Sequence, residues 1–111
     1  MAELTKLEEQ ILLSVWRLQA EAYGISIYEN IKNITKKKIA VGGVYFPLER
    51  LVKRGYLKAI KGDPTPVRGG QSKRFYKLTS FGIKELIKAK KTQEEFWKDL
   101  PGLEFAQNGT E

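Results

Sequence analysis

The sequence predicts a mainly helical fold with one small β-hairpin, in the α+β class. Three observations predict it. Apolar residues recur at helical spacing in three segments of the first half of the chain. Two short segments with alternating apolar and basic residues follow, on either side of a loop rich in Pro and Gly. A fourth helical segment then ends near residue 100, and 111 residues in total indicate one domain.

The first helix is expected to begin after Thr5. Glu8 follows three residues later, which is the spacing of a capping box, in which each side chain bonds the backbone N–H of the other residue. Apolar residues then recur on two sides of this helix, and the second apolar stripe contains Leu12 and Trp16. In so small a domain, a second apolar surface predicts contact with another subunit.

A second helix is expected after residue 24 and a third over about residues 43–54, with a brief β-type stretch at residues 39–43 between them. The third helix has Val44 and Leu48 on its buried side, and Gly55 is a natural C-terminal cap. Pro47 lacks a backbone N–H, so we place the start of this helix late, which brings the proline close to the first turn.

Residues 56–62 and 72–79 are expected to form the two strands of the hairpin. The intervening residues 63–71 contain two prolines and two glycines, which predicts a long irregular tip. The last helix is expected over residues 79–100, with Thr79 as its N-cap and Pro101 just after its end. We expect the tail at residues 101–111 to be flexible.

Three helices, a hairpin and a further helix, in this order, are typical of a winged helix-turn-helix. Residues 1–78 then form the DNA-binding domain, and the helix at residues 79–100 belongs to the same compact unit. The third helix of this fold enters the major groove, and the basic wing at residues 61–74 contacts the minor groove or the phosphates. The candidate DNA-contacting residues of these two elements are Gly42, Gly43, Tyr45, Arg50, Lys53, Arg54, Arg68, Lys73 and Arg74.

The charge distribution favours a nucleic-acid partner. The chain carries a net charge of +7, and twelve basic residues but only two acidic ones lie between Lys32 and Arg74. Positive charge concentrated in one part of a chain favours a polyanionic partner. Two alternatives stay open at the level of single residues. The three basic residues of the third helix are alternatively ordinary solvated charges, and Tyr45 is alternatively packed against the domain beside Val44.

Other classes of function have little support. The chain contains no Cys and no His, so disulfides, thiolate chemistry and the commonest metal ligands are excluded. We expect no enzyme activity, no metal and no cofactor, because no nucleophile motif or carboxylate pair stands out. No apolar run is long enough to span a bilayer, and the acidic N-terminus is unlike a signal peptide, so we expect a cytoplasmic protein.

Three segments resemble the signature segments of the PadR-type transcriptional regulators, the phenolic-acid decarboxylase repressor-like family. They are "LEEQILLSVWRLQAEAYGISIYENI", "VGGVYFPLERLVKRGYL" and "KRFYKLTSFGIKEL", and the resemblance covers roughly residues 4–90. The chain departs from the family pattern at three places in the second segment. Gly43 replaces the usual Ala, Val52 stands where an acidic residue is common, and Phe46-Pro47 shifts the proline by one place.

The resemblance implies a homodimer in which the C-terminal helix packs on the N-terminal helix of the partner. Tyr45 and Arg50 match the Tyr and Arg of the family's recognition helix, and Tyr23 matches a Tyr that often contacts phosphate. Several members also bind flat aromatic or drug-like molecules near the dimer interface. The implied interface residues are Leu12, Trp16, Leu86, Phe96 and Trp97, and the implied ligand-binding residues are Trp16, Phe96 and Trp97. Trp97 is alternatively only part of the dimer core.

The predicted function is that of a homodimeric, sequence-specific DNA-binding regulator, a repressor rather than an activator, on an inverted-repeat operator. A small aromatic ligand would relieve the repression. Two other classes remain as alternatives. One is a small-molecule sensor with an aromatic dimer interface. The other is a winged-helix protein-interaction module, which Glu49 on the third helix favours slightly.

Overall fold

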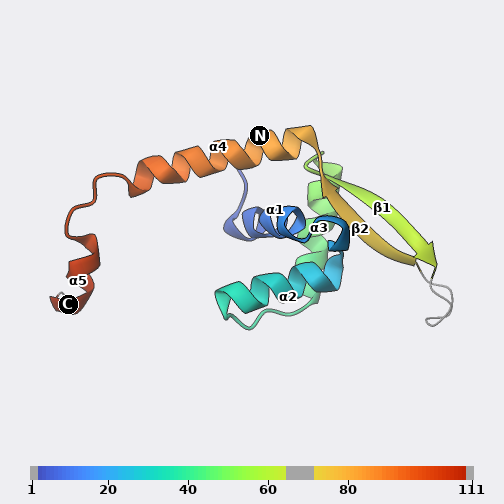
Figure 1. Cartoon of the computed structure of the whole chain (residues 1–111), viewed down its shortest axis with the longest axis horizontal. Coiled ribbons are helices and arrows are strands. Elements are labelled where there is room, and N and C mark those ends of the chain that lie inside the picture. The colour runs from blue at the N-terminus through green and yellow to red at the C-terminus, as the bar shows by residue number, and fades with distance from the viewer. Residues whose placement is uncertain (1–2, 65–71, 110–111) are drawn as a thin grey trace.

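The structure is a computed structural model that describes residues 3–64 and 72–109. Its elements, in chain order, are α1 (Lys6–Leu18), a 3-10 turn η1 (Gln19–Glu21), α2 (Gly24–Thr35), α3 (Gly42–Lys53), β1 (Leu57–Pro64), β2 (Ser72–Leu78), α4 (Ser80–Trp97) and α5 (Leu103–Gly109). The first three helices form a bundle, and the β1–β2 hairpin projects from one end of it (Figure 1). Helix α4 runs over α1 and extends past the bundle on the side away from the hairpin. The predicted winged-helix order is confirmed.

The start of α1 is fixed by the predicted capping box. The Glu8 backbone N–H donates to Thr5 Oγ1 at 3.1 Å, and the Thr5 backbone N–H donates to Glu8 Oε1 at 2.8 Å. Two donors that the helix itself cannot satisfy are therefore paired. Glu8 is only 2% exposed, so this cap is part of the packed interior as well as a local signal.

Helix α3 begins at Gly42, one residue before the predicted start, with a tight first turn. The Gly43 N–H donates to the Ala40 carbonyl at 2.9 Å, three residues back, as in a 3-10 turn. Pro47 is the sixth residue of α3 and is buried, so it lies in the second turn and not in the first. Its missing N–H leaves the carbonyl of the exposed Gly43 to solvent.

The end of α3 is a Schellman motif. Gly55 has a φ of +83°, which glycine adopts without the steric cost of a Cβ. The Gly55 N–H donates to the Val52 carbonyl at 3.1 Å and the Tyr56 N–H to the Leu51 carbonyl at 2.9 Å. The chain then turns sharply into β1, and Tyr56 is buried against the core. The prediction that Gly55 ends the helix is confirmed.

The hairpin pairs in an antiparallel register from Leu57↔Leu78 to Lys61↔Arg74. The strand β1 continues to Pro64, beyond the predicted end of the strand, with an irregular register after Lys61. The predicted brief strand at residues 39–43 is wrong, because residues 36–40 are irregular and α3 starts at Gly42. On its other side β2 bonds the chain before α2 instead, where the Tyr76 N–H donates to the Ala22 carbonyl at 2.9 Å.

The core lies where α1, α2, α3 and the base of the hairpin meet. Its buried apolar residues are Ile11, Leu12, Val15, Ala22, Ile27, Ile31, Val44, Leu48, Leu51, Tyr56, Leu57, Tyr76 and Leu78. Only the first half of α4 contributes, through the half-buried Phe81, Ile83 and Leu86. From Lys90 onward, the rest of α4 and the whole of α5 are exposed. The tail was expected to be flexible. In the structure it contains the short helix α5, which has no buried residue.

Thr79 joins three elements. Its Oγ1 accepts the Gly82 N–H at 2.9 Å, which confirms it as the N-cap of α4. The same hydroxyl lies 2.6 Å from the Gly55 carbonyl and 3.1 Å from the Tyr56 carbonyl, at the end of α3. The start of α4, the last residue of the wing and the end of the third helix are therefore held at one point.

Candidate nucleic-acid interface

Helix α3 has one buried side and one exposed side. Val44, Leu48 and Leu51 are fully buried. Successive residues of a helix are about 100° apart, so a side chain two positions from Val44 points away from the core. The exposed residues of this outward face are Gly42, Gly43, Tyr45, Phe46, Arg50 and Lys53. Five of these six were predicted as DNA-contacting residues, and Phe46 was not.

Tyr45 lies against the start of α2. A Cβ atom on Gly24 would be 2.5 Å from Cε1 of the Tyr45 ring, so the ring occupies the space that a larger residue would need. The Tyr45 side chain is nevertheless part of the outward face, because the residue is 42% exposed. Of the two readings that the sequence left open, the structure shows the packing of Tyr45 on the domain, and the DNA contact stays a prediction. Tyr45 packs on the domain and also reaches its surface.

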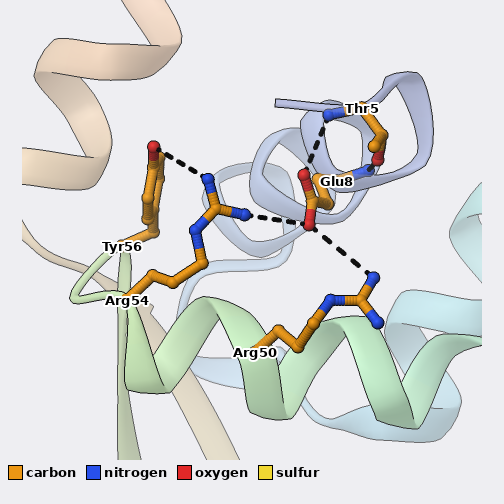
Figure 2. A network of polar contacts seen from close by, with 5 residues as sticks. All are labelled: Thr5, Glu8, Arg50, Arg54 and Tyr56. Carbon is orange, nitrogen blue, oxygen red and sulfur yellow. Dashed lines mark hydrogen bonds and ion pairs between the residues drawn. The ribbon is translucent and has the colours of Figure 1, made fainter. Parts of the chain in front are cut away.

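A buried carboxylate binds the C-terminal part of α3 to α1 (Figure 2). Glu8 Oε2 lies 3.2 Å from Arg54 Nη1 and 3.7 Å from Arg50 Nη2. The Arg54 guanidinium also stacks 4.9 Å from the centre of the Tyr56 ring, and its Nη2 lies 3.4 Å from the Tyr56 hydroxyl. One carboxylate oxygen of Glu8 accepts the capping hydrogen bond of α1, and the other faces the two arginines. Glu8 thereby neutralises positive charge inside the domain.

The two arginines of this network differ in exposure. The Arg54 side chain is 27% exposed and points toward α1 and Tyr56, whereas the Arg50 side chain is 55% exposed. Arg54 was predicted to contact DNA, but the structure assigns it to the interior network and not to the outward face. Arg50 keeps most of its donors on the surface while Glu8 restrains its orientation. Orientation by an ion pair lowers the entropy that a long side chain loses when it binds a partner.

The wing is anchored by aromatic contacts. The Tyr23 and Phe75 rings pack edge to face with centroids 5.6 Å apart, and Lys73 Nζ lies 4.2 Å from the centre of the Tyr23 ring. Tyr23 is half buried beside Phe75 of β2, next to a cationic group. Of the predicted wing residues, Lys73 and Arg74 lie at the end of β2 that is nearer the loop, with Arg74 opposite Lys61, and Arg68 lies outside the described residues.

An exposed ion pair joins the wing to α3. Arg74 Nη1 pairs with Glu49 Oε1, and the Arg74 guanidinium stacks 5.6 Å from the centre of the Tyr76 ring. Burial raises the pKa of the Tyr76 phenol, an effect that the Arg74 charge opposes and Glu49 and Tyr45 reinforce. Glu49, the one acidic group on this helix, is therefore compensated by a basic residue of the wing.

Three features of this surface were not predicted from the sequence. Glu8 was recognised as a cap but not as the partner of two arginines that lie more than 40 positions further along the chain. Phe46 was noted only as part of the proline shift, although its helical position relative to Val44 places it opposite the core. The three consecutive lysines at positions 36, 37 and 38 are exposed in the segment between α2 and α3.

The residues predicted for a dimer interface fall into two groups. Leu12 is fully buried in the core of its own chain, so its assignment to a partner-facing stripe is wrong. The exposed apolar residues of α1 are Leu13, at 53%, and Trp16, at 57%. Leu86 is half buried against its own core, while Phe96 and Trp97 near the end of α4 are about 70% exposed.

A groove of about 380 Å³ lies between the start of α1 and the second half of α4. Its apolar lining includes Leu4, Tyr56 and Phe96, and its acidic lining includes Glu9 and Glu85. Tyr56 is also the residue that contacts Arg54, so this groove touches the network that holds α3. Within the described residues, no helix is both long enough and apolar enough to cross a membrane.

Comparisons with known proteins agree with this geometry. The family model for the transcriptional regulator PadR-like family matches residues 11–88. Among solved structures, a transcriptional regulator from Clostridium thermocellum is 26% identical with a TM-score of 0.65, over 81% of this chain and 82% of that one. A Streptococcus mutans UA159 protein is 24% identical with a TM-score of 0.64, over 91% of this chain and 90% of that one. A PadR family transcription regulator from Clostridium difficile R20291 is 24% identical with a TM-score of 0.57, over 79% and 88%. A search of curated proteins found no match.

Proposed function

Because the chain belongs to the PadR-like family of transcriptional regulators, we propose that it is a homodimeric repressor that binds an inverted-repeat DNA site with α3 in the major groove. The observation that carries this proposal is the outward face of α3, where exposed cationic and aromatic side chains lie opposite a fully buried apolar side. A family of transcriptional regulators also indicates a role without catalysis.

The electrostatics of this face favour DNA over a protein partner. Glu49 is the feature that favoured a protein-interaction module, and it is paired with Arg74 of the wing. Glu8 is buried beneath the arginines and does not reach the surface. Arg50 and Lys53 on α3 and the lysines at positions 36–38, in the segment before it, remain exposed, as a polyanionic partner requires.

The apolar surface of α1 and α4 supports a homodimer. Trp16, Phe96 and Trp97 are each more than half exposed, which is costly for large aromatic side chains in water. Helix α4 extends beyond the bundle, so its second half is free to pack on a second copy (Figure 1). In this arrangement α4 lies on α1 of the partner subunit, and two α3 helices are presented about 34 Å apart, one turn of DNA.

The test of this function is selection of DNA from a random pool, followed by binding titrations across a salt series. We expect an inverted repeat with half-sites one helical turn apart. If the dimer neutralises about eight phosphates, log K falls with log salt at a slope of about −7. Failure to enrich any sequence, or binding that does not depend on salt, would contradict the proposal.

Replacement of Arg50 by Ala is expected to weaken binding to the selected site by about 1–3 kcal/mol. Lys84→Ala, an exposed lysine in the first half of α4, is the matched control, since it also removes one positive charge. A base contact makes the loss at Arg50 larger on the selected site than on random duplex, and a phosphate contact makes the two losses equal. Equal and small effects of both variants would remove Arg50 from the interface.

A ligand-relieved regulator is the second candidate, and the groove beside Tyr56 favours it. The groove is lined by the aromatic rings of Tyr56 and Phe96. Its three carboxylates outnumber the single ammonium of Lys88, which suits a flat cationic molecule. We expect planar cationic dyes to quench the fluorescence of Trp97, one turn from the groove residue Gln93, and to release the DNA. Unchanged emission and unchanged DNA affinity across a broad panel of such dyes would exclude this candidate.

A further inference from the structure

Phe46 has an unusual place in the cationic outward face of α3. It is 77% exposed, which makes it one of the two most exposed large apolar residues in the described part of the chain. Its helical position is about 200° from Val44, so the ring points away from the core. A single exposed apolar residue on a random surface has no meaning by itself. Here the surface is the one that the proposed function presents to DNA.

The neighbours of Phe46 along the helix leave its ring accessible. The residues three and four positions earlier are Gly43 and Gly42. Apart from adjacent residues and the nearby backbone of α3, no atom lies within 4 Å of where a Cβ on either glycine would be. The residue four positions later is Arg50, which Glu8 draws toward α1. Glu49, three positions later, is drawn toward the wing by Arg74. Arg50 and Glu49 are therefore each engaged by another charged group, and the Phe46 ring remains 77% exposed on this face.

The chemistry of the major groove limits what such a ring can contact favourably. A phenyl ring neither donates nor accepts a conventional hydrogen bond. Placed against the N4 amino group of cytosine or the O6 and N7 atoms of guanine, the ring would displace water molecules without replacing their hydrogen bonds to the base. The one apolar group that an unmodified base presents in this groove is the 5-methyl group of thymine.

We propose that Phe46 is a specificity-determining residue that selects thymine through its 5-methyl group, at one position of each half-site. This inference rests on the proposed function, because it requires α3 to lie in the major groove. Burial of one methyl group against the ring is expected to strengthen binding about three- to fivefold. Two half-sites in a dimer make the combined effect about ninefold to twenty-five-fold.

The experiment removes the methyl group from the DNA and the ring from the protein. Each thymine of the selected site is replaced in turn by uracil, which lacks only the 5-methyl group. For the native chain, uracil at one position of both half-sites is expected to weaken binding by the combined factor given above for the dimer. For Phe46→Ala the same replacement is expected to have no effect, and 5-methylcytosine at that position is expected to bind the native chain better than cytosine does.

Two further variants keep the test decisive. Phe46→Leu retains an apolar side chain and is expected to keep the preference for thymine over uracil. Phe105→Ala removes the comparably exposed phenyl ring of α5, outside the outward face of α3, and is expected to leave this preference unchanged. Because Phe46 is so exposed, Phe46→Ala is expected to melt at the native temperature, which circular dichroism checks.

The outcomes separate the inference from the function on which it rests. Absence of any selected sequence overturns both. A selected site to which the native chain binds equally with thymine or uracil at every position overturns the role of Phe46 alone. Equal sensitivity of the native chain and Phe46→Ala to uracil also overturns it, because the methyl group would then contact another residue.

Discussion

Replacement of Glu8 by Ala is expected to lower the free energy of unfolding by about 3 kcal/mol. The Glu8 side chain is 3% exposed and serves two structures at once, since Oε1 accepts the Thr5 N–H and Oε2 faces Arg54 and Arg50. The substitution removes half of the capping box and leaves Arg54 without its buried counter-charge. Urea unfolding followed by circular dichroism measures the loss.

Two companion variants divide this loss into its causes. Glu9→Ala changes the neighbouring, less buried carboxylate and is expected to alter stability by no more than about 0.5 kcal/mol. Glu8→Gln keeps the length of the side chain and an oxygen for the Thr5 N–H but removes the charge, and is expected to fall between the two Ala variants. Similar values for Glu8→Ala and Glu9→Ala would show that the network of Figure 2 adds nothing to stability.

The Glu8 variants also bear on DNA binding. With the counter-charge removed, Arg50 and Arg54 are no longer drawn toward α1, and the positive charge of α3 increases. We therefore expect Glu8→Gln to raise the affinity for random duplex relative to the selected site. In physical terms, the buried carboxylate restricts arginine side chains that would otherwise bind any phosphate.

Replacement of Gly82 by Ala is expected to destabilise the protein by about 3 kcal/mol, or to displace α4. A Cβ at this position would lie 2.2 Å from the Tyr56 carbonyl oxygen and 3.0 Å from its carbon, which are backbone atoms that cannot rotate away. The same oxygen accepts the Thr79 N–H at 3.1 Å. The added methyl group therefore acts on the point where α3, the wing and α4 are joined. Thermal unfolding measures the stability, and hydrogen exchange of the Thr79 amide reports the junction.

Gly43→Ala is the matched control, since it makes the same chemical change in another helix. Apart from adjacent residues and the nearby backbone of α3, no atom lies within 4 Å of the Cβ position at Gly43. Alanine loses less backbone entropy on folding than glycine, so Gly43→Ala is expected to stabilise the protein by about 0.5–1 kcal/mol. If the unfolding temperature of Gly82→Ala is no lower than that of Gly43→Ala, the start of α4 is not fixed against Tyr56 as the structure indicates.

Local signals in the sequence were sufficient for the elements themselves. The Thr5–Glu8 spacing predicted the start of α1, and Gly55 predicted the end of α3. Thr79 was correctly identified as the cap of α4. Each of these signals acts through hydrogen bonds within a few residues, so neighbouring positions in the chain contain the necessary information. The predicted strand before α3 failed because a strand also needs a partner, and β2 bonds to the chain at Ala22 instead.

Which residues share a face was decided by the tertiary structure. Leu12 and Leu13 are adjacent apolar residues, and helical spacing alone did not show that the first is fully buried and the second is 53% exposed. Arg54 was predicted from the sequence to contact DNA, but the fold places it against Glu8, 46 positions away. The sequence alone determined a winged helix with a basic third helix. Only the packing of distant segments determined which of its charges are neutralised inside and which, with Phe46, remain at the surface.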